Sequence, residues 1–216
     1  MHRDNQAEIR EYPEVQGPLD ANAGSAELTD LFVQHRERLV QMIRLRMDQR
    51  LLGRVDASDV IQEAYLECAR RYDDYRENPQ MPLFLWVRLQ TSQKLIDLHR
   101  RHLNVRMRDA GREVAVHHAT APAASSIALA AQLLGRLTTA SNAAIRKETQ
   151  LRVQDALNTM DAIDREVLTL RHFEMLTNEE TASVLEISKT AASNRYIRAL
   201  MRMKEIATGI SGLDNE

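Results

Sequence analysis

The sequence is poor in the residues that make tight turns and covalent cross-links. Its 216 residues include seven glycines, five prolines and one cysteine. So few glycines and prolines argue against an all-β protein with many tight turns and favour helices. The single cysteine, Cys68, excludes an intramolecular disulfide and any cluster of thiolate ligands, and it is typical of a reducing compartment.

Aromatic residues and long apolar stretches are also scarce. Phe, Trp and Tyr make up 4% of the chain, so the core must be largely aliphatic. No basic segment followed by an apolar one opens the sequence, and the longest uncharged stretch, residues 114–135, contains His117, His118 and Pro122. We therefore expect neither secretion nor membrane insertion, and a cytoplasmic location.

Acidic and basic residues nearly balance, with a net charge of −2, but they are segregated along the chain. Residues 31–108 carry 15 basic and 10 acidic side chains, and residues 186–204 carry five and one. Residues 1–30 and 151–185 are acidic instead. Two basic surfaces far apart in sequence suit a bipartite nucleic-acid-binding protein, although two solvated helix faces would give the same totals.

Apolar residues at intervals of three and four predict three amphipathic helices in the first half of the chain. Gly53 separates the first from the second, and Asp56 or Ser58 suits the second as its N-cap. A polar loop over residues 73–79 precedes the third. Residues 1–25, with little periodicity, are expected to be a disordered acidic tail. The predicted helices cover residues 28–47, 58–72 and 82–102.

The second half of the chain ends in a short helix, a tight turn and a longer basic helix. Residues 104–142 are rich in alanine, serine and threonine, and we expect a linker with at most a short helix at 127–134. Further on, Thr177 and Glu180 are spaced to form a capping box. The predicted helices here cover residues 142–160, 164–175, 178–185 and 189–206, and the last of them buries Ala192, Tyr196, Ala199 and Met203.

This outline is that of a helix-turn-helix, whose second helix can enter the major groove of DNA. An ordinary helical hairpin has the same outline. However, the exposed residues of the last helix are hydrogen-bonding and phosphate-binding types, and Asn194 suits adenine in particular. The residues predicted to face DNA are Lys189, Ser193, Asn194, Arg195, Ile197, Arg198 and Arg202.

Short motifs occur in order along the chain, at residues 59–66, 83–87, 95–101, 164–182 and 187–195. The first reads Asp-Val-Ile-Gln-Glu-Ala-Tyr-Leu and the second contains Trp86. Together they resemble the motifs of bacterial alternative sigma factors of the extracytoplasmic-function (ECF) type. The sequence of residues 108–109 and 191–196 resembles that of a subgroup common in planctomycete-like bacteria.

The resemblance implies an all-α protein with two small helical domains. Sigma domain 2 would bind core RNA polymerase and the −10 element of promoter DNA, and sigma domain 4 would bind the −35 element. It also implies an anti-sigma factor or another regulator as a partner. The implied division is a tail at 1–25, sigma domain 2 at 26–103, a linker at 104–142, sigma domain 4 at 143–208 and a second tail at 209–216.

Two candidate surfaces follow in the first domain. Asp59, Gln62 and Glu63 can share an exposed helix face, which by resemblance meets the clamp helices of the largest polymerase subunit. Opening DNA needs a pocket for an unstacked base, because unstacking costs a few kcal/mol. The residues predicted to bind the −10 element are Tyr72, Tyr75, Arg76, Asn78, Gln93, Asp97, Arg100 and Arg101.

Other classes of function have little support in the sequence. It has no Gly-rich phosphate loop and no nucleophile–base pattern, so we expect no enzyme and no cofactor. His99 and His102 could share a helix face as metal ligands, but no third ligand accompanies them, so no metal site is expected. The rival interpretation is a two-domain helix-turn-helix regulator that binds DNA without polymerase. Such a protein would not need Tyr72, Tyr75, Trp86 and a basic helix together.

Overall fold

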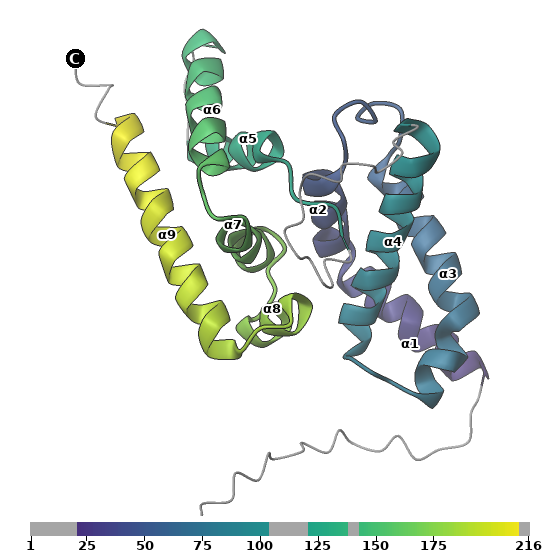
Figure 1. Cartoon of the computed structure of the whole chain (residues 1–216). Helices are drawn as coiled ribbons and strands as arrows, with labels where there is room; N and C mark the ends of the chain where they lie inside the picture. Colours follow the sequence, from purple (N-terminus) through teal and green to yellow (C-terminus); the bar gives the residue numbers. More distant parts are fainter. Residues whose placement is uncertain (1–20, 104–120, 138–142, 212–216) are drawn as a thin grey trace, which may run out of the picture.

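The structure is a computed structural model that describes residues 21–103, 121–137 and 143–211. These residues contain helices and no β-strand, which confirms the predicted all-α class. The helices form two groups that lie side by side, α1–α4 and α5–α9 (Figure 1). Their bounds are α1 Ala21–Gln34, α2 Arg36–Arg46, α3 Ala57–Glu77, α4 Leu83–Leu103, α5 Ser126–Leu137, α6 Ala143–Asn158, α7 Ala162–Leu168, the π-helical turn η1 Thr169–Phe173, α8 Asn178–Leu185 and α9 Lys189–Ser211.

The first group of helices packs around an aliphatic core. Leu39, Ile43, Ala64 and Leu95 from α2, α3 and α4 are fully buried there. Cys68 lies in the same core, and burial raises the pKa of its thiol to about 12. The cysteine is therefore a small core side chain with little thiolate at neutral pH.

The helix predicted at 28–47 is in fact two helices. His35 leaves helical geometry, with φ −105° and ψ 12°, and separates α1 from α2. Its ring packs against Phe84 of α4, with 4.5 Å between ring centroids, a long-range contact that apolar spacing cannot report. α1 also begins at Ala21, inside the predicted tail, whose residues 1–20 lie outside the described part of the chain.

The helix α3 runs further than predicted, to Glu77, so most of the loop expected at 73–79 is helical. The last turn of α3 is held in place by Tyr75. The Tyr75 ring stacks on Trp86 with 4.7 Å between centroids, and its hydroxyl donates to the Met81 carbonyl at 2.8 Å. These tertiary contacts outweigh the local preference of two consecutive aspartates for a turn.

α8 and α9 form the predicted helix-turn-helix. The capping box of Thr177 and Glu180 is present at the start of α8. Glu186 then reverses the chain in left-handed geometry, with φ 51° and ψ 41°. α9 is longer than predicted and ends at Ser211, so it includes the start of the expected tail at 209–216, whose last five residues are outside the described part.

Part of the expected linker at 104–142 packs against both groups. The helix α5 is longer than the short helix expected there, and it lies against α6 and α2. The backbone N–H of Ser125, just before α5, donates to the Leu45 carbonyl of α2 at 2.8 Å. Residues 104–120 and 138–142 lie outside the described part of the chain.

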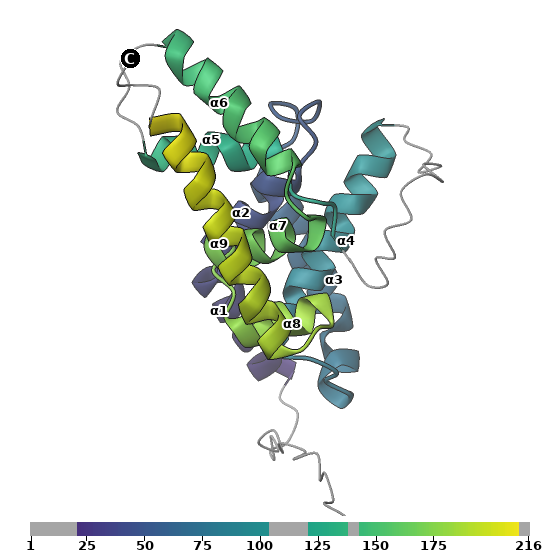
Figure 2. The ribbon, with the colours of Figure 1, turned by 60° about the vertical axis from the view of Figure 1, so that its left-hand side comes forward.

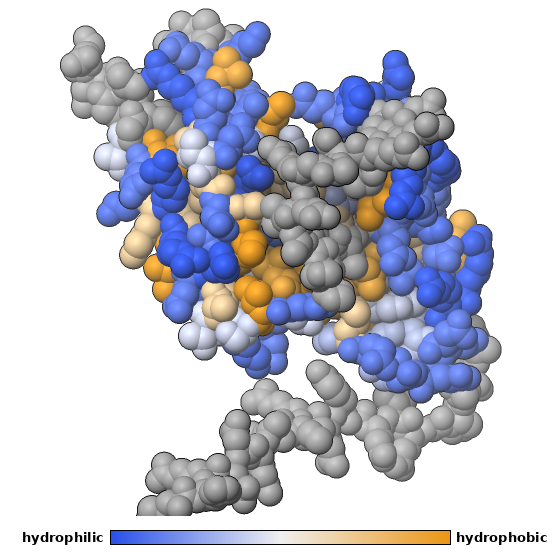
Figure 3. Space-filling view, in the orientation of Figure 1, coloured by the Kyte–Doolittle hydropathy of each residue, from blue (hydrophilic) through white to orange (hydrophobic). Residues whose placement is uncertain are grey.

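The two groups meet along a partly apolar junction. Figure 2 shows α9 running along the outer side of the second group, over α7 and α8. In the space-filling view, hydrophobic residues gather near the middle of the face and hydrophilic residues cover its outer sides (Figure 3).

Among the described residues, none of the helices combines the length and apolar character that a membrane span requires.

Candidate nucleic-acid and polymerase interfaces

The helix α9 has a buried face and an exposed face, as predicted. Ala192 and Ala199 are fully buried against α7 and α8, and Tyr196 and Met203 are partly buried. The exposed side of α9 presents donors, acceptors and several apolar side chains to solvent, and the donors and acceptors are groups that contact base edges and phosphates. Its members from the predicted reading set are Lys189, Ser193, Asn194, Ile197, Arg198 and Arg202.

Two arginines of the predicted reading set share one carboxylate. Asp164 of α7 accepts hydrogen bonds from Arg195 Nη1 at 2.7 Å and from Arg198 Nε and Nη2 at 3.1 Å each. Burial alone would raise the pKa of Asp164, but the hydrogen bonds and charges of Arg198 and Arg195 outweigh it and lower this pKa. Asp164 thus fixes the direction of both arginines, a role that its position in the sequence does not predict.

The first turn of α9 is tied to α8. Lys189 Nζ lies 2.6 Å from Glu179 Oε1, and Asn178 Nδ2 donates to the Lys189 carbonyl at 2.9 Å. The Ser188 hydroxyl accepts from the Ala191 N–H at 3.1 Å, as expected for an N-cap. The helix dipole and the early backbone amides favour a phosphate at this end.

A small cavity of about 170 Å³ lies between the end of α3 and the start of α4. The stacked rings of Tyr75 and Trp86 form one side of it, and Asn78 adds a polar group. Of the eight residues predicted to bind the −10 element, the cavity brings together Tyr75 and Asn78. The other lining residues, which the sequence did not single out for this role, are Arg71, Asp74, Gln80 and Met81.

Tyr72 and Arg76 do not line this cavity. Tyr72 is 5% exposed and donates its hydroxyl hydrogen to Glu27 Oε2 of α1 at 2.6 Å. Burial and this hydrogen bond raise the pKa of Tyr72. The Arg76 guanidinium lies 6.0 Å from the centroid of the Tyr72 ring. The structure therefore places Tyr72 in the packing of α1 against α3 and not on the exposed surface.

Gln93 and Asp97 lie on one side of α4. Both are exposed, and they follow Trp86 at spacings of seven and eleven residues, which puts all three on the same helix face. Arg100 Nη1 lies 3.8 Å from Asp97 Oδ1. This stripe continues from the cavity along α4 toward its basic end.

The predicted polymerase face is exposed on α3. Asp59, Gln62 and Glu63 are accessible to solvent, while Ile61 is buried as predicted. Glu63 Oε2 accepts from Arg101 Nη2 of α4 at 2.9 Å. The structure thus connects the acidic face of α3 with one of the arginines predicted to hold the promoter strand.

An apolar groove of about 430 Å³ borders this face, between α1 and α3. Val33 and Leu66 are 72% and 54% exposed at its edges, and Gln62 belongs to both the groove and the acidic face. This groove was not predicted from the sequence. The signal that could have indicated it is the presence of Val33 and Leu66, two large apolar residues, on the polar faces of amphipathic helices. The other lining residues are Thr29, Phe32, Arg36, Ile61 and Tyr65.

The described residues contain no group of three or more His, Cys, Asp or Glu side chains that could hold a metal ion. His99 has a different role, because its Nε2 accepts from the Asp48 N–H at 3.2 Å. Burial lowers the pKa of His99, which suits a neutral ring with an acceptor nitrogen.

The helix-turn-helix corresponds to a known family. Residues 150–203 match the family described as "Sigma-70, region 4". The matched segment is a quarter of the chain, and it resembles region 4 of sigma-70 factors. The region 4 match includes α7, α8 and the exposed face of α9, so it favours the sigma-factor interpretation of these helices over that of an ordinary helical hairpin.

Two solved structures are similar to the chain. The structure of CnrH in complex with the cytosolic domain of CnrY has 20% sequence identity and a TM-score of 0.49, over 88% of this chain and 95% of that chain. The co-crystal structure of the sigma factor RpoE with the anti-sigma factor NepR from Bartonella quintana has 16% identity and a TM-score of 0.45, over 87% of this chain and 98% of that chain. No curated protein is a significant match.

Proposed function

We propose that this chain is a sigma factor of the ECF type, which binds core RNA polymerase, directs it to specific promoters and helps to open the DNA. The observation that carries the proposal is the region 4 match over residues 150–203, where a helix-turn-helix exposes Ser193 and Asn194. The motifs of the first domain, residues 26–103, support the ECF type. Binding energy alone supplies this function, without covalent chemistry or a cofactor.

In this proposal α9 reads the −35 element in the major groove. Ser193 and Asn194 are exposed near the start of the helix, where recognition helices contact base edges. Lys189 at the first turn and Arg202 further along suit phosphates, because both side chains are exposed and cationic. Arg195 and Arg198 would reach DNA only in the direction that Asp164 allows.

The cavity between α3 and α4 would capture an unstacked base of the −10 element. A base can stack on an aromatic ring for about 1–3 kcal/mol, which offsets the cost of unstacking it from the duplex. Asn78 beside the rings of Tyr75 and Trp86 supplies the donors and acceptors for a base edge. Gln93, Asp97 and the arginines 100 and 101 would follow the strand along α4.

The face of Asp59, Gln62 and Glu63 would bind the polymerase clamp helices, together with the apolar groove beside it. Protein interfaces combine an apolar centre with a polar rim that steers association. Val33 and Leu66 would supply the apolar part here, and the two acids the rim. The family resemblance also implies a regulator, such as an anti-sigma factor, and the planctomycete-like subgroup remains a prediction.

Run-off transcription with purified core polymerase on a genomic promoter pool tests the proposal. We expect transcripts that start at a limited set of promoters and depend on this chain. Changing Asp59→Lys together with Glu63→Lys should weaken binding to core polymerase about tenfold, because like charges then face the clamp helices. The matched control, Asp73→Lys with Glu77→Lys, makes the same charge change at the other end of α3 and should leave core binding unchanged.

The rival function, a regulator that acts without polymerase, gives a different result. Such a protein would bind its promoter duplex tightly by itself, and it would not direct initiation by core polymerase. Equal co-purification of core polymerase with the Asp59 and Glu63 variant, with the control variant and with the unchanged chain would rule out the proposed polymerase face.

A further inference from the structure

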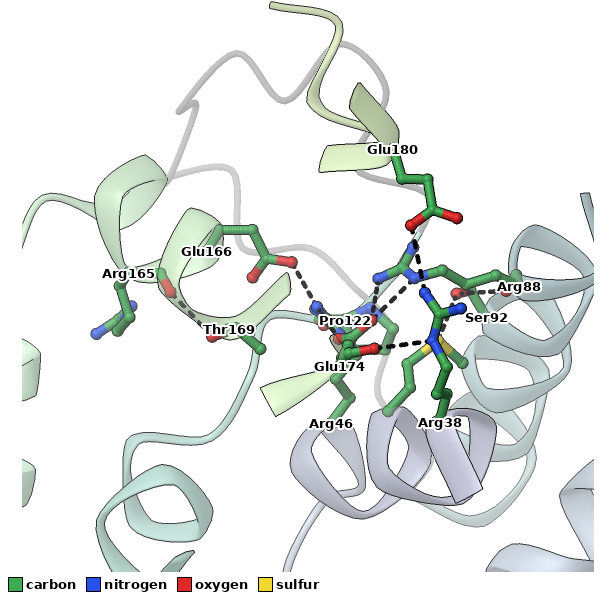
Figure 4. Close-up of polar contacts among 11 residues, drawn as sticks. Arg38, Arg46, Arg88, Ser92, Pro122, Arg165, Glu166, Thr169, Glu174 and Glu180 are labelled. Atoms are coloured by element: carbon green, nitrogen blue, oxygen red, sulfur yellow. Dashed lines mark hydrogen bonds and ion pairs between the residues drawn. The ribbon is translucent and has the colours of Figure 1, made fainter. Parts of the chain in front are cut away.

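Glu174 lies at the centre of the contact between the two groups of helices. Its side chain is 1% exposed, and each carboxylate oxygen meets a different arginine of the first group (Figure 4). Oε1 accepts from Arg46 Nε at 2.9 Å and from Arg46 Nη2 at 2.6 Å, and Oε2 accepts from Arg88 Nε at 2.9 Å. One acid of the second group thus joins α2 to α4.

Further ion pairs surround this contact. Arg46 Nη2 also lies 2.5 Å from Glu166 Oε1 of α7. The two buried arginines, Arg46 and Arg88, are thus neutralised by two glutamates. Arg38 donates from Nε to the Glu174 carbonyl at 3.2 Å and lies 3.3 Å from Glu180 Oε2 of α8. In Figure 4, these arginines from the first group converge on glutamates of the second.

Apolar packing keeps water away from the contact. Leu170 and Leu176, on either side of Glu174 in the sequence, are fully buried within the core cluster of the first group. Burial would raise the pKa of Glu174, but the charges and hydrogen bonds of Arg46 and Arg88 outweigh it and lower this pKa. Because the charges are buried, removing one partner leaves the others uncompensated, which is strongly unfavourable.

We propose that Glu174 is a latch that holds the free chain in a closed form, in which it cannot read two promoter elements at once. This inference rests on the proposed function. Lys189 at the start of α9 pairs with Glu179 of α8, and the adjacent Glu180 pairs with Arg38 of α2, so the start of α9 is connected to the first group through α8. The resemblance to sigma factors implies −10 and −35 elements about two helical turns, or about 70 Å, apart, so the two groups must separate before both elements are bound.

Opening moves Glu174, Arg46 and Arg88 from a dry contact into water. A partner that binds only the separated domains, such as core polymerase, shifts this equilibrium by its difference in affinity for the two forms. In the absence of that partner the latch keeps the chain closed. Promoter DNA alone is then bound weakly, because the closed chain cannot contact both promoter elements at once.

Small-angle X-ray scattering of the full chain tests the latch without polymerase. Glu174→Gln keeps the shape of the side chain and removes its charge, so the ratio of closed to open chain should fall on the order of a hundredfold. We expect a larger radius of gyration than for the unchanged chain, for which a compact fold of this length predicts about 17 Å. Glu148→Gln, the same change at an exposed ion pair within α6, should give no expansion.

An equal radius for the unchanged chain and Glu174→Gln, or an equal expansion in Glu148→Gln, would overturn the latch. Unfolding is separated from opening by circular dichroism and by binding to a −35 duplex, both of which an open but folded chain retains. Because scattering needs no polymerase, a chain that expands as expected but directs no transcription supports the latch and refutes the proposed function.

A covalent lock tests the same contact in the opposite direction. Arg38→Cys and Glu180→Cys, joined by a cleavable bis-maleimide, should hold the chain closed and abolish run-off transcription until the cross-link is cleaved. Cys68 is buried, so the unchanged chain treated with the same reagent serves as the control. Full transcription by the cross-linked chain would show that closure does not restrain this protein.

Discussion

Two of the arginines of α9 are positioned by an acid on another helix. Asp164 takes three hydrogen bonds from Arg195 and Arg198, and it stands just after Asp161, the N-cap of α7. An arginine held in this way loses less conformational freedom when it meets a phosphate or a guanine. The same acid therefore contributes to the stability of region 4 and to the readiness of its recognition helix.

Changing Asp164→Asn should destabilise region 4 by about 1–3 kcal/mol at neutral pH, because two arginines lose a charged acceptor. The folded pKa of Asp164 lies below its unfolded value, so the ion pairs stabilise the fold above the unfolded pKa of about 4 and stop doing so as the pH falls through the folded value. Urea unfolding between about pH 6 and pH 3 should show the difference between variant and unchanged chain shrink below about pH 4. A difference that stays constant over this range would contradict the assignment.

Asn194 and Arg202 offer a matched pair for testing how α9 reads DNA. Asn194→Ala should cost about 1–3 kcal/mol on the preferred −35 duplex and relax selection at one base position. Arg202→Ala should weaken all sequences alike and reduce the salt slope by about one. Binding to a library of −35 duplexes at several salt concentrations measures both. Arg198 is a poorer probe, because its truncation also removes a partner of Asp164.

A uniform loss of affinity in Asn194→Ala, with no change in base preference, would mean that Asn194 contacts the backbone instead. The exposed position of its side chain next to Ser193 could be predicted from the sequence, since the inward residues Ala192 and Ala199 fix the opposite face of the helix. The carboxylate that holds its neighbours could not be predicted, because residue 164 lies on a different helix.

Among the helices, the pair α3 and α4 shows that local sequence patterns do not always predict where a helix ends. The amphipathic spacing of both helices predicted their existence, but Asp73 and Asp74 suggested a loop where α3 in fact continues. Both acids are exposed on the helix surface, and the turn is held by Tyr75 against Trp86. When a helix end is fixed by stacking against another helix, the neighbouring residues in the sequence carry no signal of where the helix ends. The capping box of Thr177, by contrast, is a local device and was predicted correctly.

Tyr75→Ala combined with Asn78→Ala should impair promoter opening more than initial binding to duplex DNA. The reason is that the cavity between α3 and α4 is offered only to a base that has left the stack. Permanganate footprinting reports unstacked thymines, and a duplex-binding assay reports the first step. Tyr75→Phe is the control, since it retains the ring that stacks and loses only the hydrogen bond to Met81.

Loss of both steps to the same extent in the double variant would argue against a pocket for a flipped base. The α3 and α4 side chains would then act on the duplex as a whole. Asn158→Ala, an exposed asparagine on α6, controls for the loss of an amide elsewhere in the chain and should change neither step.

For the whole molecule, the sequence predicts two domains and a linker, which allow either independent motion of the domains or a closed form in which they pack together. The predicted helix 164–175 names no partner for Glu174, yet the structure buries this residue against Arg46 and Arg88, 128 and 86 residues away along the chain. Sequence periodicity reports which face of a helix is apolar. It does not report which distant arginines will meet an acid, so the closed form became visible only in three dimensions.

The π-helical turn η1 has a consequence for how closure is encoded. Its wider hydrogen bond, from the Glu174 N–H to the Thr169 carbonyl at 3.0 Å, inserts one residue relative to an α-helix and so shifts the helical phase by about 100°. A chain that lacks one residue between Thr169 and Phe173 would keep the sequence of both region 4 helices, yet residue 174 would point away from Arg46 and Arg88. The affinity of the two groups of helices for each other thus depends on the length of this five-residue turn. A single deletion or insertion there changes it without altering any residue that is proposed to touch DNA.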